Sequence, residues 1–117
     1  MALQDPYQIE TTGRRLTCTI SQRDVSHLEL ADVIDDCMQQ MRNNGVSVFI
    51  FDLREVEFLA SACLGVLVQF LQDLESTRGK IALVGCQDNV KFIFKVTRLD
   101  QVFDLYDDMD EALDALR

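Results

Sequence analysis

The chain has 117 residues, 48% of them apolar, and a formal net charge of −9. This length supports one domain with its own core and leaves no room for a second, so we treat residues 1–117 as a single domain. The excess of Asp and Glu over Lys and Arg excludes a surface that binds nucleic-acid phosphates. The N-terminus lacks the basic and apolar regions of a signal peptide. No apolar run approaches the roughly 20 residues that span a bilayer, so we expect a cytoplasmic protein.

The predicted elements begin with two strands and a helix. Residues 7–12 and 16–20 alternate apolar and polar side chains, which is typical of a β-hairpin or of two edge strands. Ser26 and Glu29 form a capping box ahead of a helix, and Gly45 is a natural stop for it. The apolar face of this helix consists of Leu30, Val33, Ile34, Cys37 and Met41.

A strand, a loop and a second helix follow. Residues 46–53 are mostly β-branched and aromatic, which favours a parallel strand buried on both faces. Residues 62–78 carry helical spacing, and Gly79 is expected to end that helix. Loops after such strands hold the working groups of many α/β proteins, and Ser61 lies in this loop. The sequence therefore presents one serine for recognition or modification.

The last part of the chain continues the alternation. Residues 80–85 are a predicted strand, and Asp88 caps a short helix. A short strand is predicted around residues 102–103, and Asp108 with Glu111 forms a second capping box for a final helix. The order of elements predicts an α/β fold with a mixed, mostly parallel sheet and about four helices packed on it.

The segment from residue 52 to 67 resembles the signature of the STAS domains, the fold of anti-sigma-factor antagonists and of the cytosolic tails of sulfate transporters. It reads Asp-Leu-Arg-Glu-Val-Glu-Phe-Leu-Ala-Ser-Ala-Cys-Leu-Gly-Val-Leu. In that family the strand ends in Asp-Leu and the helix opens with Asp-Ser-Ser/Thr-Gly-Leu-Gly. Residues 81–85, 90–97 and 99–103 resemble later parts of the family, and Asp24 falls near the acidic residue before its first helix. The resemblance implies a single STAS domain.

Ser61 occupies the family's phosphoacceptor position. Three of its neighbours depart from the pattern: Ala60 replaces Asp, Ala62 replaces Ser or Thr, and Cys63 replaces Gly. A phosphate on Ser61 would carry roughly −1.5 to −2 charges at the positive end of a helix, so we expect the fold to survive and a docked partner to be repelled. The alternative is that Ser61 is only a helix N-cap.

The helix after Ser61 has more apolar surface than one core stripe needs. Val66 and Phe70 lie off its stripe, and Phe92 and Val96 lie beside the stripe of the next helix. This excess predicts a docking patch for a partner protein or a second copy, and the alternative is burial on two sides within one domain. The predicted partner-binding residues are Asp24, Ala60, Ser61, Ala62, Cys63, Leu64, Val66, Phe70 and Phe92.

The cysteines and the single histidine suggest no metal site and no cofactor. Cys18, Cys37, Cys63 and Cys86 are widely spaced, and His27 is alone. Three of the thiols are interpreted as buried apolar groups. Cys63 lies in the first turn of a helix, where the dipole lowers a thiol pKa, so a thiol sensor is a third interpretation.

Enzymatic functions are not supported. No glycine-rich nucleotide motif is present, and the acidic pairs 35–36 and 107–108 lie on a helix face and at a cap. The resemblance implies an interaction module that binds an anti-sigma factor or serine kinase and is regulated at Ser61, with a phosphatase as a further candidate partner. The alternative is a constitutive, unphosphorylated STAS scaffold in a stress complex or a lipid-transport ATPase.

Overall fold

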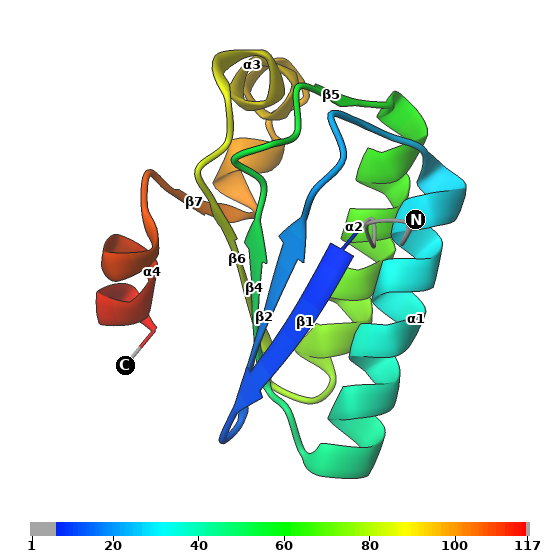
Figure 1. Cartoon of the computed structure of the whole chain (residues 1–117), viewed down its shortest axis with the longest axis vertical. Coiled ribbons are helices and arrows are strands. Elements are labelled where there is room, and N and C mark those ends of the chain that lie inside the picture. The colour runs from blue at the N-terminus through cyan, green and yellow to red at the C-terminus, as the bar shows by residue number, and fades with distance from the viewer. Residues whose placement is uncertain (1–6, 117) are drawn as a thin grey trace, which may run out of the picture.

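The computed structural model describes residues 7–116, and its main sheet has five strands. β1 (Tyr7–Thr12) and β2 (Arg15–Ile20) form an antiparallel hairpin. β4 (Val48–Asp52), β6 (Lys80–Val84) and β7 (Asp104–Tyr106) add to it in parallel, in the order β1-β2-β4-β6-β7 (Figure 1). The predicted fold class, an α/β domain with a mixed and mostly parallel sheet, is confirmed.

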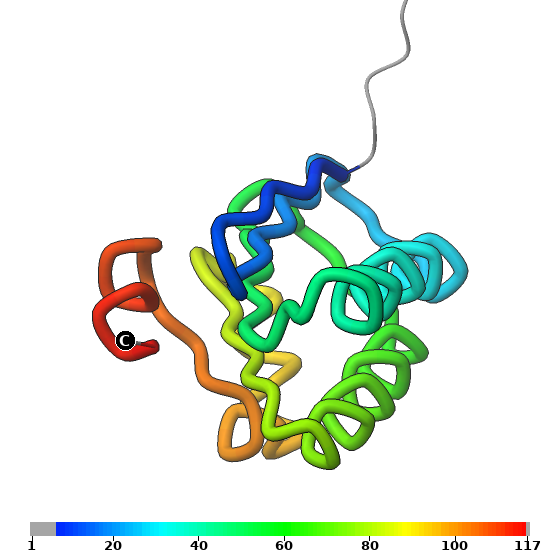
Figure 2. Tube along the Cα trace, turned by 90° about the horizontal axis from the view of Figure 1, so that it is seen from below, coloured from blue at the N-terminus to red at the C-terminus, as the bar shows by residue number. Residues whose placement is uncertain are grey.

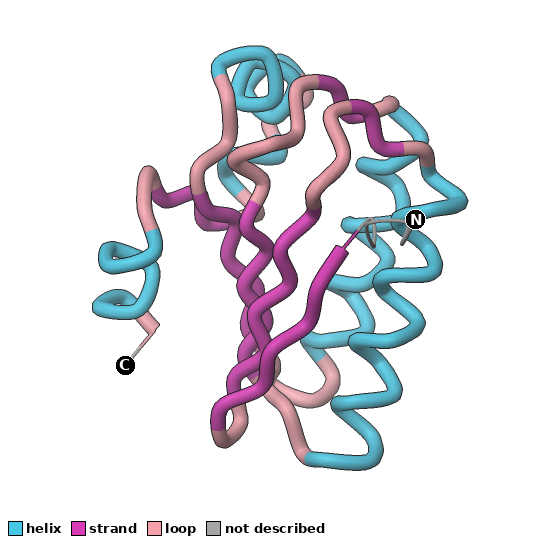
Figure 3. The backbone as a smooth tube through the Cα atoms, viewed as in Figure 1, coloured by secondary structure: helices cyan, strands magenta, loops and turns pink. Residues whose placement is uncertain are grey.

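Helices cover the two faces of this sheet unequally (Figures 2 and 3). The helices are α1 (His27–Asn44), α2 (Ser61–Glu75), α3 (Asp88–Val96) and α4 (Met109–Ala115). Each crossover from β2 to β4, β6 and β7 moves in one direction along the sheet, and right-handed crossovers of that kind place their helices on one face. α1, α2 and α3 therefore share a face, and α4, after the last strand, covers the other (Figure 1).

The strands at the centre of the sheet are buried on both sides. Phe49 and Phe51 of β4 belong to the main core with α1, α2 and α3, whereas Ile50 packs in a second, smaller core with Ala112 of α4. This burial on two faces explains the continuous apolar run of β4. β2 is different, because its buried residues alternate with half-buried polar ones, which leaves its second face polar.

The ends of α1 follow from local sequence signals. The backbone N–H of Glu29 donates to Ser26 Oγ at 3.2 Å, and the backbone N–H of Ser26 donates to Glu29 Oε1 at 3.3 Å. Gly45 ends the helix with a left-handed φ of 68°. The predicted capping box and the predicted stop are both confirmed.

Three predicted boundaries of α2 and α3 are wrong by one to three residues. α2 ends at Glu75, because Arg78 adopts a left-handed φ of 59° that no α-helix continues through. Gly79 does not end the helix. Its lack of a side chain leaves room for Leu74, because a Cβ at position 79 would lie 2.8 Å from Leu74 Cδ2. The N-cap of α3 is Gln87, and Asp88 is its first helical residue.

The segment after α3 also differs from the prediction. Residues Leu99–Gln101 form a 3₁₀ turn, η1, and strand β7 begins at Asp104, after the predicted positions 102–103. Phe103 leaves the strand because its ring packs into the core, 5.8 Å from the ring of Phe94. Of the predicted capping box of α4, the half made by Asp108 is confirmed, since Asp108 Oδ1 accepts from the backbone N–H of Glu111 at 2.9 Å.

Candidate partner-binding site

The carboxyl ends of the parallel strands meet at one end of the molecule, the upper end in Figure 1. A small parallel ribbon lies there, formed by β3 (Asp24–Val25) and β5 (Phe58–Leu59), with Asp24 paired to Phe58. α2 begins two residues after β5, and α3 contacts β5. In sheets of this kind ligands and partners bind beyond the carboxyl ends of the strands.

Ser61 is exposed at this end and is the first residue of α2. Ala60, in an extended conformation, is the N-cap, and no side-chain hydrogen bond caps the helix. The alternative that Ser61 serves as the N-cap is therefore wrong. Among residues 7–116 no hydrogen bond involves the Ser61 hydroxyl, so the group is available to react without loss of a structural contact.

The residues beside Ser61 divide into two pairs. Ala60 and Ala62 are exposed, as the predicted contact role requires, whereas Cys63 and Leu64 are buried. The thiol of Cys63 donates to the backbone carbonyl of Val25 at 3.3 Å. The prediction of partner contacts by Cys63 and Leu64 is wrong, because both side chains point into the core. Cys63 therefore places no bulk in the path of a partner.

Burial also contradicts the thiol-sensor interpretation. Desolvation raises the pKa of Cys63, and this effect exceeds the lowering by a hydrogen bond with the backbone of Ala60. The carboxylates of Glu29 and Asp24 raise the pKa of Cys63 further. A phosphate on Ser61 would lie at the favourable N–H groups of the helix, on a surface that also carries Asp24 of the β3–β5 ribbon.

The residues of the predicted docking patch that lie beside the apolar stripes of their helices differ in burial. Phe70 is 1% exposed, and its ring lies 5.1 Å from that of Phe49 and 6.3 Å from that of Phe51, edge-on in both cases. The predicted contact of Phe70 with a partner is wrong, because the domain itself buries this side chain, as the alternative expected. Val66 is half-buried and packs against the core. Phe92, by contrast, is 63% exposed, so its role as a contact stays a prediction.

Phe58 is an exposed aromatic residue that the sequence analysis did not select. Its side chain is 56% exposed, whereas that of Leu59 is 4% exposed. The backbone N–H groups of Glu57 and Phe58 both donate to the carbonyl of Arg23 at 2.8 Å, and the Arg23 guanidinium pairs with the Glu57 carboxylate at 2.8 Å. The sequence contained one signal of this exposure. Successive side chains of a strand point to opposite faces, so a buried Leu59 places Phe58 on the exposed face.

An ion pair between the buried carboxylate of Asp52 and the exposed guanidinium of Arg54 lies in the loop before Ser61, and a hydrogen bond joins this loop to the loop before α3. Asp52 is 4% exposed at the end of β4 and accepts from Arg54 Nε at 3.0 Å and Nη2 at 2.8 Å, in a bidentate arrangement. Arg54 covers Gly85, whose φ is 71°, and its carbonyl accepts from Gln87 Nε2 at 2.8 Å. The carboxylate of Asp52 raises the pKa of Arg54.

The other three cysteines are buried, as predicted. Burial raises the pKa of Cys18 to about 12 and that of Cys86 to about 11, and it also raises the pKa of Cys37. Within residues 7–116 no group of three His, Cys, Asp or Glu side chains is placed to hold a metal ion, and no helix is long and apolar enough to cross a membrane.

Buried thiols of raised pKa predict slow labelling of the folded protein. At about pH 8 fewer than one of the four thiols per chain should react with Ellman's reagent within minutes. The reagent cannot reach the buried thiols, and their raised pKa leaves little of the reactive thiolate. All four should react in denaturant. A Ser76→Cys variant, with a thiol at an exposed position, supplies the control for a fast reaction. Rapid reaction of one native thiol that is lost in Cys63→Ala would restore the sensor interpretation.

The similarity of the chain to known proteins agrees with this arrangement. Residues 9–112 match the family model of the STAS domain. Over 75 residues the chain is 33% identical to a Thermotoga maritima protein named as a candidate anti-sigma factor antagonist, and this match spans 64% of the chain and 66% of that protein.

Two solved structures share the fold. One is the anti-sigma factor antagonist SpoIIAA in its unphosphorylated form, at 18% identity and a TM-score of 0.82, with 95% of this chain and 96% of that chain covered. The other is the Bacillus cell fate determinant SpoIIAA in its phosphorylated form, at 17% identity and a TM-score of 0.74, with 95% and 99% covered. With the family match over most of its length, the chain belongs to the STAS domain family.

Proposed function

We propose that this chain is an anti-sigma-factor antagonist, a cytoplasmic, non-enzymatic protein that binds an anti-sigma factor and is released when Ser61 is phosphorylated. One observation carries the proposal: Ser61 is exposed at the start of α2, and no described hydrogen bond occupies its hydroxyl. The names of the Thermotoga and SpoIIAA relatives support the same role.

The binding surface of the proposal, called the Ser61 surface below, consists of Asp24, Phe58, Ala60, Ser61 and Ala62. All five are exposed. Phe58 supplies an aromatic side chain of the type that dominates the energy of protein interfaces. The two alanines carry no side chain beyond Cβ, so a kinase can bring its own backbone close to the serine.

Phosphorylation would act on the partner and leave the fold intact. The phosphate would add roughly −1.5 to −2 charges to a surface that already carries Asp24 and that a bound partner would have to desolvate. The first N–H groups of α2 offset that charge within the domain, because the helix N-terminus favours anions. We therefore expect loss of binding without unfolding.

The second candidate is a constitutive scaffold that is never phosphorylated. It is favoured by Ala60, which removes the acidic side chain that the family places beside its serine and with it a contact for Arg or Lys of a kinase. Asp24 still supplies one exposed carboxylate on the same surface. The two candidates differ in whether Ser61 reacts.

Phosphorylation by a serine kinase encoded near the gene for this chain separates the two. We expect one phosphate per chain on Ser61 by mass spectrometry, none in Ser61→Ala, and an unchanged circular dichroism spectrum. Ser76→Ala is the matched control, since Ser76 is exposed at the opposite end of α2, and it should be labelled like the natural chain. Labelling that persists in Ser61→Ala contradicts the assignment, and an unlabelled chain that still binds the kinase favours the scaffold.

A further inference from the structure

The segment from Leu59 to Cys63 is joined at both of its ends to the same residue, Val25. Leu59 pairs with Val25 in the ladder between β3 and β5. At the other end, the thiol of Cys63 donates to the backbone carbonyl of Val25 at 3.3 Å. Ser61 lies midway between these two contacts and is exposed. We refer to residues 59–63 as the Ser61 segment.

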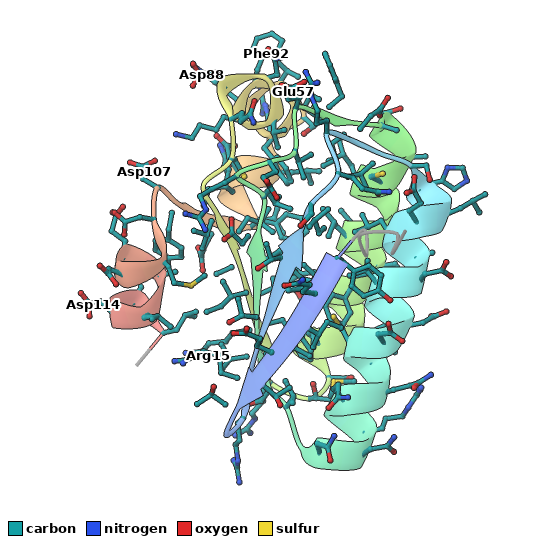
Figure 4. The ribbon with its side chains drawn as sticks, in the orientation of Figure 1. Arg15, Glu57, Asp88, Phe92, Asp107 and Asp114 are labelled. Atoms are coloured by element: carbon teal, nitrogen blue, oxygen red, sulfur yellow. The ribbon has the colours of Figure 1, made fainter. Side chains whose placement is uncertain are left out.

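Both anchoring points of the Ser61 segment are buried. Val25 is 1% exposed, Leu59 4% and Cys63 0%, whereas the residues between the two contacts, 60–62, are exposed. The β3–β5 ribbon lies at the upper end of the molecule, where Figure 4 shows Glu57, the residue before β5. The segment is therefore an exposed bend that the core holds at two points.

Cys63 can act as a hydrogen-bond donor at neutral pH. Burial raises the pKa of Cys63, so the sulfur keeps its proton. The backbone N–H of Cys63 also donates to the carbonyl of Ala60, the N-cap of α2, at 2.8 Å. Cys63 therefore connects the first turn of α2 to the N-cap of the helix through its backbone and to β3 through its side chain.

The side-chain contact is a feature of this chain and does not follow from the STAS pattern. Gly occupies the position of Cys63 in that pattern, and a glycine has no side chain that could reach the Val25 carbonyl. Loss of a donor to a buried carbonyl is costly, so a donor at position 63 stabilises the packing of α2 against β3. A thiol is a weak donor, so we expect this stabilisation to be modest.

We propose that Cys63 is a positioning residue, which holds Ser61 at a fixed place relative to Asp24. Asp24 directly precedes Val25 in β3. Ser61 begins the turn of α2 that Cys63 joins to the Val25 carbonyl. A surface that is ordered before binding loses less conformational entropy when a partner docks on it. This proposal rests on the proposed function, in which Asp24 and Ser61 belong to one partner-binding surface.

The simpler role for Cys63 is that of a small apolar side chain that fills space in the core. In that role its truncation would lower the stability of the whole domain without a local change at the start of α2. Cys63→Ala removes both the sulfur and the donor, whereas Cys63→Ser restores a donor without restoring the apolar volume. Recovery in Cys63→Ser therefore identifies the hydrogen bond as the cause.

The first measurement is amide hydrogen exchange of the free domain, followed by NMR and corrected for intrinsic rates. In Cys63→Ala we expect the amides of residues 63 and 64 to exchange about three to ten times faster, because the first turn of α2 opens more often. In Cys63→Ser these rates should lie within about twofold of those of the natural chain. Cys37→Ala is the matched control, since Cys37 is also 0% exposed but lies in the C-terminal half of α1. It should leave exchange at residues 63 and 64 unchanged.

The second measurement is the affinity for the cognate anti-sigma factor, by calorimetric titration. Cys63→Ala should bind about three to ten times more weakly, because the partner must then order the Ser61 segment. Cys63→Ser should bind within about twofold of the natural chain, and Cys37→Ala should bind like the natural chain. Urea unfolding of the same variants checks that each is folded under the conditions of the titration.

Unchanged exchange at residues 63 and 64 in Cys63→Ala contradicts the proposal, and so does faster exchange with full affinity. An equal loss of affinity in Cys37→Ala would show that stability alone governs binding, which also contradicts the proposal. The exchange measurement needs no partner, so failure of this proposal is distinguishable from failure of the proposed function. If the natural chain itself does not bind the anti-sigma factor, the proposed function is wrong, and with it the role of Cys63 in binding.

Discussion

Replacement of Phe70 by Ala is expected to lower the free energy of unfolding by about 3–5 kcal/mol. The ring is 1% exposed and lies edge-on to Phe49 at 5.1 Å and to Phe51 at 6.3 Å. Its removal would leave a cavity between α2 and the sheet, because the surrounding aromatic rings can collapse only in part. Urea unfolding followed by circular dichroism measures the loss.

Phe92→Ala provides the comparison for this variant. Both residues lie off the apolar stripe of their helices in the sequence, but Phe92 is 63% exposed, so its removal should change the free energy of unfolding by no more than about 0.5 kcal/mol. Similar losses for the two variants would contradict the burial assigned to them. A Phe70→Ala variant as stable as the natural chain would show that Phe70 is not part of the core.

Phe58→Gln should weaken binding of the anti-sigma factor by about two orders of magnitude, or roughly 2–3 kcal/mol. Phe58 is the large exposed side chain nearest in sequence to Ser61, and truncating a central aromatic residue of an interface removes much of its binding energy. Because the side chain is 56% exposed, the stability of the free domain should hardly change. Calorimetric titration and urea unfolding together measure both effects.

Phe58→Leu is the matched control, since it keeps most of the apolar area and should bind within about tenfold of the natural chain. Full affinity in Phe58→Gln would remove Phe58 from the interface. A variant that loses stability and affinity in parallel would show that Phe58 supports the β3–β5 ribbon instead of contacting the partner.

The sequence predicts the local features of this fold well. The capping box of Ser26 and Glu29, the left-handed stop at Gly45 and the strand β4 all depend on residues close together in the chain. Each has a local physical cause, such as a backbone N–H that needs an acceptor or a conformation that only Gly adopts easily. A few neighbouring residues of the sequence are enough to indicate such a cause. The same is true of the order of strands and helices, from which the mostly parallel sheet follows.

The burial of Phe70 and the exposure of Phe92 could not be predicted in the same way. The two side chains occupy similar positions relative to their own helices, and what differs is the surroundings. α2 packs along the length of the sheet and against α1, so its buried arc is wide, whereas α3 lies at the end of the sheet. Such differences arise from tertiary packing and leave no trace in the periodicity of a single helix.

Cys63 and Ser61 show a second limit. The helix dipole predicts a lowered pKa for Cys63, but a packed position against the Val25 carbonyl makes desolvation the larger effect. For Ser61, a start of α2 one residue earlier than predicted changes a capping serine into an exposed helical one. Helix boundaries vary by one or two residues, and a shift of that size decides the chemistry of the site.

The most direct test of the account is a calorimetric titration of the anti-sigma factor with two forms of the chain, unphosphorylated and phosphorylated on Ser61 alone. The unphosphorylated form should bind, and the phosphorylated form should bind about 100-fold more weakly or not at all, with the same circular dichroism spectrum and unfolding midpoint. Equal affinity of the two forms would contradict a switch at Ser61, and a phosphorylated chain that has unfolded would contradict the claim that the helix N-terminus accommodates the phosphate.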